Sequence, residues 1–256
     1  MSGLSLALRQ MRYENKSFWR NPPAAFFTFA FPLIFLVLFT LLFGSGTTRL
    51  PSGQEVEVST FYVAAILAFA VINACYTNLA TSLPFSRDEG ILKRVRGTPL
   101  PPWSFLAGKI LHAILMMVLL VVIVVTFGAL LYDAELPIDN LGEFLVSLII
   151  GSAAFCALGL ATTAIIPNAE AAPAIVNGLI LPLLFISGIF IPLEQAPAWL
   201  VNVAELFPVK HFADAMVTSY FDPGGGFEAS DLLWVGLWGL AGLLLAVRFF
   251  SWEPRR

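Results

Sequence analysis

Charged residues are scarce in this sequence. They make up 12% of its 256 residues, whereas 58% of the residues are hydrophobic. A water-soluble domain carries about 25% charged residues, which cover its surface. A soluble protein with buried helices is therefore excluded, because the polar covering surface that it would need is missing. Six stretches lack any charged side chain, and these are residues 21–48, 58–86, 110–132, 144–169, 171–193 and 232–247.

Reactive motifs are missing as well. The sequence has no Gly-x-x-x-x-Gly-Lys-Ser/Thr phosphate loop, no Gly-x-Ser-x-Gly elbow and no His-Glu-x-x-His zinc motif. Its two cysteines, Cys75 and Cys156, lie in apolar stretches and are interpreted as packing residues, with neither a disulfide nor a metal site expected. The net charge of −3 does not indicate a nucleic-acid partner. The sequence therefore indicates a protein that is not itself an enzyme.

The charge-free stretches have the length of transmembrane helices. About 20 apolar residues are needed to cross a bilayer core, and only the stretch 232–247 is shorter. Arg248 can extend that helix, because its charged end can reach the lipid headgroups. We therefore predict an all-α membrane protein whose residues 1–256 form a single transmembrane domain. Six helices are expected at about 24–43, 61–83, 105–131, 144–166, 172–191 and 232–251.

Basic residues are distributed unevenly between the two sides of such a bundle. With six alternating spans, all but two of the 14 Lys and Arg residues fall on one side, and the exceptions are Arg49 and Lys210. Basic residues gather on the cytoplasmic side of a membrane, so both termini are predicted to be cytoplasmic. Pro173 and Pro182 leave open that 171–193 is a re-entrant hairpin and not a full span.

The N-terminal arm has the pattern of a helix that lies on the membrane surface. Over residues 4–20, apolar side chains share one face and basic side chains form a stripe beside it. This pairing suits an interfacial helix at an anionic leaflet. The residues of the apolar face are Leu4, Ala7, Leu8, Met11, Phe18 and Trp19.

The loop between the second and third spans, residues 84–104, carries strong local signals. Ser86 is expected to cap a short helix over 86–97, which Gly97 and the following Pro99 end. Acidic residues stand near its start and basic residues near its end, as the helix dipole favours. A loop that only returns the chain does not need this specification, so we predict a docking element for a partner protein. The acidic residues near its start are Asp88 and Glu89, and the basic residues near its end are Lys93, Arg94 and Arg96.

The outer loop, residues 192–231, is too polar to cross the membrane. It nevertheless contains two amphipathic segments, Ala198–Phe207 and Val209–Phe221. Helices of about 10–13 residues cannot span a bilayer. We expect both to be re-entrant or interfacial helices that lie in the outer interface or dip into it.

Polar groups deep in the predicted spans are uncharged. Asn73 and Thr77 share a face of the second span, and Asn177 lies in the fifth. Such residues join helices more often than they contact a substrate, so they are only secondary candidates for substrate binding. The missing intramembrane charges argue against coupling to an ion gradient. A six-helix secondary carrier or channel without an ATPase partner is the alternative hypothesis.

Three stretches, taken in order, resemble a known family. The first is the loop from Arg87 to Pro99, the second runs from Ser187 to Leu193, and the third is Leu206-Phe207-Pro208 with His211. Together with the six spans they resemble the type-2 ABC transporter permeases, in particular the short bacterial drug-resistance and polysaccharide or lipid export members.

The resemblance implies a permease without an ATPase of its own. Two such subunits would pair, as a homodimer, in the bacterial cell membrane, and each would dock a nucleotide-binding ATPase subunit that holds ATP and Mg²⁺. No cofactor is expected on this chain. The implied cargo is a lipidic, amphipathic drug-like or glycan substrate that moves outward. The residues that would belong to the coupling segment are Glu89, Gly90, Lys93, Arg94, Arg96 and Gly97.

Overall fold

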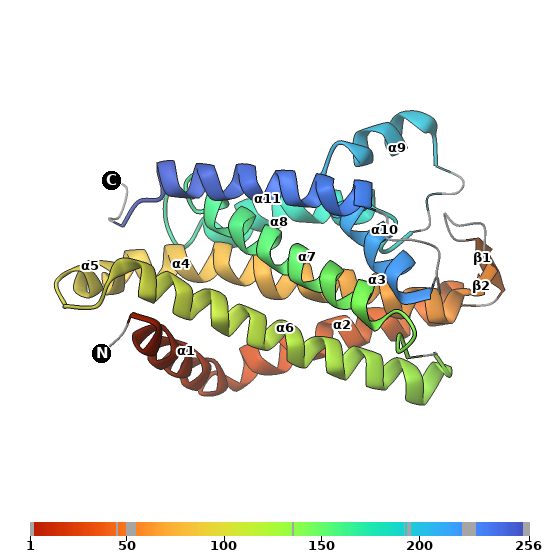
Figure 1. Cartoon of the computed structure of the whole chain (residues 1–256), viewed down its shortest axis with the longest axis horizontal. Coiled ribbons are helices and arrows are strands. Elements are labelled where there is room, and N and C mark those ends of the chain that lie inside the picture. The colour runs from red at the N-terminus through yellow and green to blue at the C-terminus, as the bar shows by residue number, and fades with distance from the viewer. Residues whose placement is uncertain are drawn as a thin grey trace.

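The computed structural model describes residues 3–44, 46–49, 55–134, 136–191, 193, 196–221 and 229–252, which form a bundle of helices (Figure 1). Five helices in this part of the chain are long and apolar enough to cross a membrane. The prediction of a mainly helical membrane protein is confirmed. The five are α2 (Pro22–Phe43), the continuous helix α3–η1–α4 (Val58–Asp88), α6 (Pro102–Tyr132), α7 (Leu141–Thr162) and α11 (Ala229–Phe249).

The continuous helix Val58–Asp88 stands at the centre of the bundle. It consists of α3 (Val58–Ile72), the π-helical segment η1 (Asn73–Thr77) and α4 (Asn78–Asp88). In the most apolar 18-residue stretch of this helix, 78% of the residues are buried. In the corresponding stretch of α2, at the periphery, 11% are buried. Ala64, Ala65 and Ala68 are fully enclosed, because small side chains allow neighbouring helices to approach closely. The helix extends beyond the predicted 61–83 at both ends.

The fifth predicted span, 172–191, contains a shorter helix than expected. Helix α8 (Ala172–Phe185) has 14 residues, which corresponds to about 21 Å. Gly188 then adopts a φ of 86°, a left-handed conformation that a helix cannot continue through. The remaining apolar residues form a turn in which Phe190 is buried, and the hydroxyl of Tyr62 donates to its carbonyl oxygen. The apolar stretch is therefore divided between a short helix and a packed turn.

The outer loop contains two helices, as predicted, and they differ in burial. Helix α10 (Pro208–Phe221) packs against α3, α7 and α11, and Phe212 and Met216 are fully buried. Helix α9 (Ala198–Glu205) leaves Trp199 and Val203 exposed, and it stands apart from the bundle in Figure 1. Residues 192, 194, 195 and 222–228 of this loop lie outside the described residues.

A small β-ribbon accompanies the helices. Strands β1 (Thr47–Arg49) and β2 (Glu55–Glu57) pair antiparallel, with Thr48 opposite Val56. At three residues each, they are too short for a periodic pattern to reveal them in the sequence.

The N-terminal helix α1 (Gly3–Trp19) lies against the beginning of α6, close to the predicted range 4–20. Ala7 is fully buried, and Gly108 of α6 lies so close to α1 that a Cβ atom there would stand 3.0 Å from the carbonyl oxygen of Ala7. Leu4 and Leu8 remain exposed beside this contact. Helix α1 is therefore fixed to the bundle and still presents apolar side chains outward.

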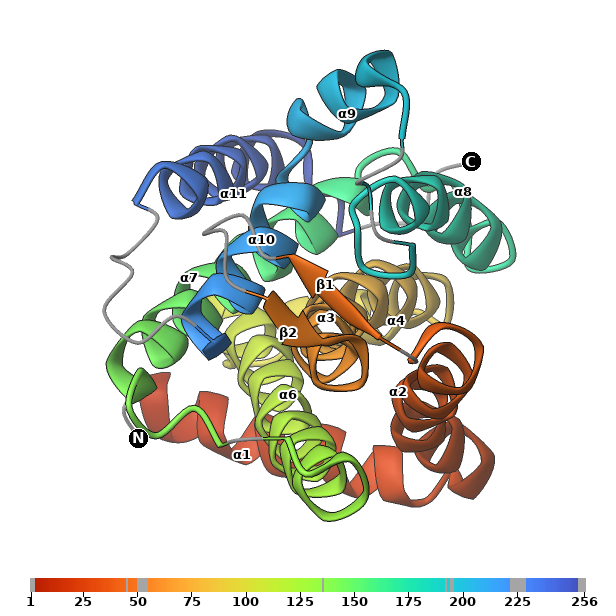
Figure 2. The ribbon, with the colours of Figure 1, turned by 90° about the vertical axis from the view of Figure 1, so that its right-hand side faces the viewer.

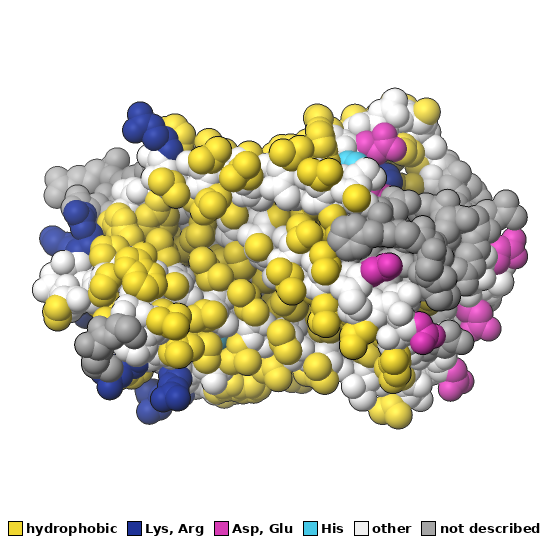
Figure 3. Space-filling model, in the orientation of Figure 1, with side chains coloured by type: hydrophobic (Ala, Val, Ile, Leu, Met, Phe, Trp, Pro, Cys, Tyr) yellow, Lys and Arg dark blue, Asp and Glu magenta, His cyan; other side chains and the backbone are white. Residues whose placement is uncertain are grey.

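Charges are segregated along the long axis of the molecule. Figure 3 shows Lys and Arg side chains at the left end, Asp and Glu side chains at the right end, and a hydrophobic belt between them. The left end contains α5 and the N-terminal part of α1, whereas the right end contains the β-ribbon (Figure 1). We call these the basic end and the acidic end. The belt is the surface that a bilayer core would cover.

Candidate functional site

The basic end is built around a sharp break in the chain after the central helix. Helix α4 ends at Asp88, and α5 (Ile91–Arg96) begins after Gly90, which has a φ of 72°. Only glycine adopts this left-handed conformation without steric cost. Leu92 is buried and anchors α5 to the core. The break therefore turns the chain from a membrane-spanning helix into a short surface helix.

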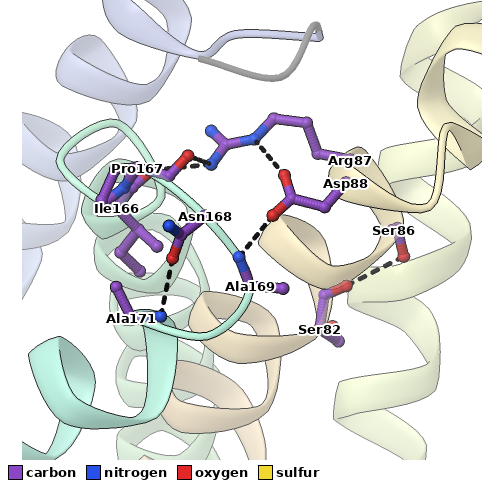
Figure 4. A network of polar contacts seen from close by, with 9 residues as sticks. All are labelled: Ser82, Ser86, Arg87, Asp88, Ile166, Pro167, Asn168, Ala169 and Ala171. Carbon is purple, nitrogen blue, oxygen red and sulfur yellow. Dashed lines mark hydrogen bonds and ion pairs between the residues drawn. The ribbon is translucent and has the colours of Figure 1, made fainter. Parts of the chain in front are cut away.

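Arg87 and Asp88 join the end of α4 to the turn between α7 and α8 (Figure 4). The buried guanidinium of Arg87 donates to the carbonyl oxygens of Ile166 at 2.7 Å and Pro167 at 3.0 Å. Its Nε lies 3.7 Å from Asp88 Oδ1, and Asp88 Oδ2 accepts a hydrogen bond from the backbone N–H of Ala169. We call these five residues the basic-end clamp.

The coupling helix begins later in the structure than the sequence predicted. Ser86 does not cap a helix over 86–97, because it lies inside α4 and donates to the carbonyl oxygen of Ser82. Asp88 likewise belongs to the end of α4 and not to the start of α5. The loop 84–104 is therefore shorter than predicted, since α4 occupies its first residues and α6 begins at Pro102.

The predicted coupling residues lie together on and beside α5. Arg94 donates to the carbonyl oxygens of Glu89 and Gly90, and it thereby holds the connection between α4 and α5. Gly97 ends α5 with an ordinary φ of −81°. Several residues around the buried Leu92 are exposed, and these are Glu89, Lys93, Arg94, Arg96 and Gly97. Together they form one accessible, mainly basic surface.

Helix α1 supports this end from the other side. Lys109 Nζ forms an ion pair with Glu14 at 3.1 Å, and both side chains are largely buried. The hydroxyl of Ser104 donates to the carbonyl oxygen of Gly3 at 3.0 Å. The start of α6, which follows α5 along the chain, is thus fixed to α1. A displacement of α5 would consequently reach α1 and α6 as well as α4.

The secondary candidates for substrate contacts are not gathered into one site. Asn73 and Thr77 lie half-buried in η1, whereas Asn177 is exposed on α8. Among the described residues, no hydrogen bond links these three side chains. Tyr76, also in η1, accepts a hydrogen bond from Thr162 of α7. The π-helical geometry is nevertheless notable, because such segments often occur at functional positions in long helices.

Sequence reasoning did not find the clamp. The turn at residues 167–172 contains no basic residue, so nothing in it indicated an arginine partner. Arg87 is contributed by a helix 79 positions earlier in the chain. A carboxylate directly after a lone arginine at the end of an apolar stretch was the only available signal. No group of three or more metal-binding side chains occurs among the described residues.

Comparison of the sequence with known proteins shows which protein family it matches. The family described as ABC-2 type transporter matches residues 8–221. The sequence is 24% identical over 187 residues to the Probable multidrug ABC transporter permease YbhR of Escherichia coli, covering 73% of this chain. It is 31% identical over 190 residues to the Daunorubicin resistance ABC transporter permease protein DrrB1 of Streptomyces coeruleorubidus, covering 72% of this chain.

The aligned regions cover unequal shares of these relatives. The match spans 49% of the Escherichia coli protein and 64% of the Streptomyces protein. A third relative, the Putative transport permease YvfS of Bacillus subtilis, is 24% identical over 212 residues, with 82% of this chain and 83% of that protein covered. The match to the family includes α2, the central helix, α5, α6, α7 and both outer helices.

Proposed function

Because this chain belongs to the ABC-2 type transporter family, we propose that it is the membrane-spanning permease subunit of an ATP-driven exporter. The family implies an ATP-binding partner, and the sequence contains no phosphate loop of its own. The observation that carries the proposal is the basic surface around α5. It is exposed, it is anchored by the buried Leu92, and it is joined directly to the central helix.

The proposed coupling surface consists of Glu89, Gly90, Lys93, Arg94, Arg96 and Gly97. An ATPase subunit that binds ATP and Mg²⁺ would contact this surface. Closure of two ATPase subunits would displace α5, and a rigid-body motion of the central helix would follow. The basic-end clamp supports this route, because it ties the end of α4 to the α7–α8 turn. The motion would thereby reach α8 as well as the central helix.

We further propose six spans with both termini in the cytoplasm of a bacterial cell membrane. The segregation of basic and acidic side chains supports this orientation (Figure 3). In this arrangement α8, with the turn that follows it, serves as the fifth crossing. A second copy of the chain would complete the translocation path, since the peripheral α2 leaves most of its apolar surface uncovered.

The proposed cargo is an amphipathic drug-like, lipidic or glycan molecule that moves outward. The names of two relatives, a probable multidrug permease and a daunorubicin resistance permease, support the drug-like class. The apolar spans suit such a cargo. A secondary carrier is the competing function, and the two differ in their energy source.

The test begins with the tagged chain purified from its native membrane. We expect an ATPase with a phosphate loop to copurify, and we expect the isolated permease neither to bind nor to hydrolyse ATP. The complex in vesicles should export daunorubicin only with ATP. ATP turnover by the chain alone, or transport driven by an ion gradient without any ATPase, would overturn the proposal.

A further inference from the structure

His211 of α10 contacts three helices at the acidic end, and Figure 2 looks onto this end with α9, α10 and α11 as neighbours. Its Nδ1 lies 2.6 Å from the carboxylate of Asp231, in the first turn of α11. Its Nε2 lies 2.7 Å from the backbone carbonyl oxygen of Glu205, the last residue of α9. The ring also packs edge-on against Trp234, one turn further along α11. One imidazole therefore joins α9, α10 and α11.

Both ring nitrogens of His211 face oxygen atoms that accept hydrogen bonds and have none to donate. An ionised carboxylate and a backbone carbonyl group are acceptors only. A neutral imidazole carries one N–H and can serve only one of these oxygens, whereas the imidazolium carries two and serves both. In the neutral ring the proton stays on the side of Asp231, because a charged acceptor makes the stronger hydrogen bond. The bare Nε2 would then face the carbonyl oxygen of Glu205 with no hydrogen between them, and this contact would be repulsive.

The other charged side chains around His211, besides Asp231, come from α9 and α10. Glu205 is the only charged residue of α9, and its own carboxylate is exposed. Lys210 forms an ion pair with Asp214. Burial alone lowers the pKa of Lys210, but the nearby carboxylates outweigh it and raise that pKa above its usual value. Lys210 therefore stays charged over the range in which histidine titrates.

Asp214 is a further group of this cluster that can titrate. Burial raises its pKa above the usual value, against the opposing effect of the Lys210 ammonium. The helices packed on the remaining sides of α10 add little charge, since α3 and α8 contain no charged residue and α7 contains only Glu143, in its first turn. A pH response that arises from Asp214 can be separated from one that arises from His211 by substitution of His211.

Little else holds α9 in place. Of its residues only Ala204 is buried, whereas Trp199 and Val203 are exposed. Within the described part of the chain, no hydrogen bond other than that to His211 joins α9 to the bundle. The next tie lies just beyond the helix, where Trp238 Nε1 donates to the carbonyl oxygen of Leu206 at 3.2 Å. The contact with His211 therefore decides whether the end of α9 stays docked.

We infer that His211, with Asp231 and the carbonyl group of Glu205, is a pH-sensitive latch for α9. The protonated ring holds α9 against α10 and α11, and transfer of the Nε2 proton to water releases α9. In the proposed topology the latch faces the outside of the cell, so it would respond to external pH. The latch itself depends neither on that topology nor on the proposed export function.

Release of α9 is measured at Ala204, where a cysteine is shielded only while the helix is docked. The permease with Ala204→Cys, in lipid nanodiscs that leave both faces accessible, reacts with a maleimide at about pH 5 and about pH 8.5, on either side of the range in which histidine changes charge. Each rate is divided by that of Ala198→Cys, an exposed position in the same helix, to correct for ionisation of the thiol. We expect this ratio to be about tenfold higher at the higher pH, as follows from losing a hydrogen bond from a charged donor.

Variants of this reporter assign the response to the latch. In His211→Gln the ratio should be the same at both pH values, because the amide does not change charge. In Asp231→Asn the new amide can donate to Nδ1, so that a neutral ring keeps its N–H on Nε2 and still holds α9. The ratio should then stay low at both pH values. His112→Gln is the matched control, because His112 is the other histidine of the chain and lies in α6 near the basic end, and the response should not change.

Two results would overturn the proposal. One is an equal ratio at both pH values in the Ala204→Cys reporter itself, which carries no change in the latch. The other is a persisting pH response in His211→Gln, which would assign the response to Asp214 or to another carboxylate.

Discussion

The guanidinium of Arg87 donates a hydrogen bond to the carbonyl oxygen of Ile166 across 2.7 Å, within the turn between α7 and α8. This bond joins two segments that are far apart in the sequence and fixes the end of the central helix. A charged donor makes a stronger hydrogen bond to a carbonyl oxygen than a neutral donor does. The end of the central helix and the α7–α8 turn should therefore move as one unit.

Arg87 should be needed for both stability and coupling. We expect Arg87→Met to lower the free energy of unfolding by about 2–3 kcal/mol, because hydrogen bonds from a charged donor are lost and buried carbonyl oxygens are left without it. Arg87→Lys keeps the charge but cannot reproduce the planar donor geometry, so it should be intermediate. Thermal melting of the purified permease and drug-stimulated ATPase activity of the complex measure the two effects. Wild-type melting and stimulation in Arg87→Met would contradict the role of the clamp.

Gly90 and Gly97 provide a matched pair on either side of α5. Gly90→Ala should cost about 1–2 kcal/mol, because a left-handed backbone conformation is unfavourable for alanine. A new Cβ atom at Gly90 would meet no other atom within 4 Å, so the effect is one of backbone conformation alone. Gly97→Ala, at a φ of −81°, should change stability by less than about 0.5 kcal/mol. Melting curves of the two variants test this, and equal losses would mean that the left-handed turn is unimportant.

The coupling surface should be sensitive to charge reversal. We expect Arg94→Glu or Glu89→Lys to abolish drug-stimulated ATPase activity and to weaken capture of the partner, since losing a charged interface contact costs about 2–5 kcal/mol when the contact is buried. Membrane insertion should not change. Glu55→Lys at the acidic end is the control and should leave coupling intact. ATPase stimulation and pull-down at matched expression decide the question, and similar behaviour of inner and outer variants would show that α5 is only a surface turn.

Orientation can be measured with single cysteines at described positions. Thr47→Cys and Ala198→Cys lie at the acidic end and should react with an impermeant maleimide added to intact cells. Thr98→Cys, next to α5, should react only after the cells are opened. The native Cys75 and Cys156 are buried and should contribute little background. Labelling of Thr98→Cys but not Thr47→Cys in intact cells would reverse the proposed topology.

The sequence by itself determined the membrane class, the approximate positions of the long helices and the location of α5. These depend on hydrophobic length and on charge distribution, which are local properties of the chain. The amphipathic face predicted for α10 was likewise visible, and its Phe212 and Met216 are buried in the bundle. The start of α5 was misplaced, because a serine followed by acids resembles a helix cap even when the preceding helix continues through it.

Only the tertiary structure decided the contacts between segments distant in the sequence. The partner of Arg87 is a pair of backbone carbonyl groups, which have no sequence signature. The hydroxyl of Tyr62 likewise donates to a backbone carbonyl oxygen, that of Phe190 in the turn after α8. At the acidic end, one pocket is lined by carboxylates from β2 and from the α6–α7 connection together with Tyr220 of α10. Each of these residues looks like an ordinary loop or helix-end residue in the sequence. Their proximity follows from how the long helices pack, which hydrophobic periodicity does not encode.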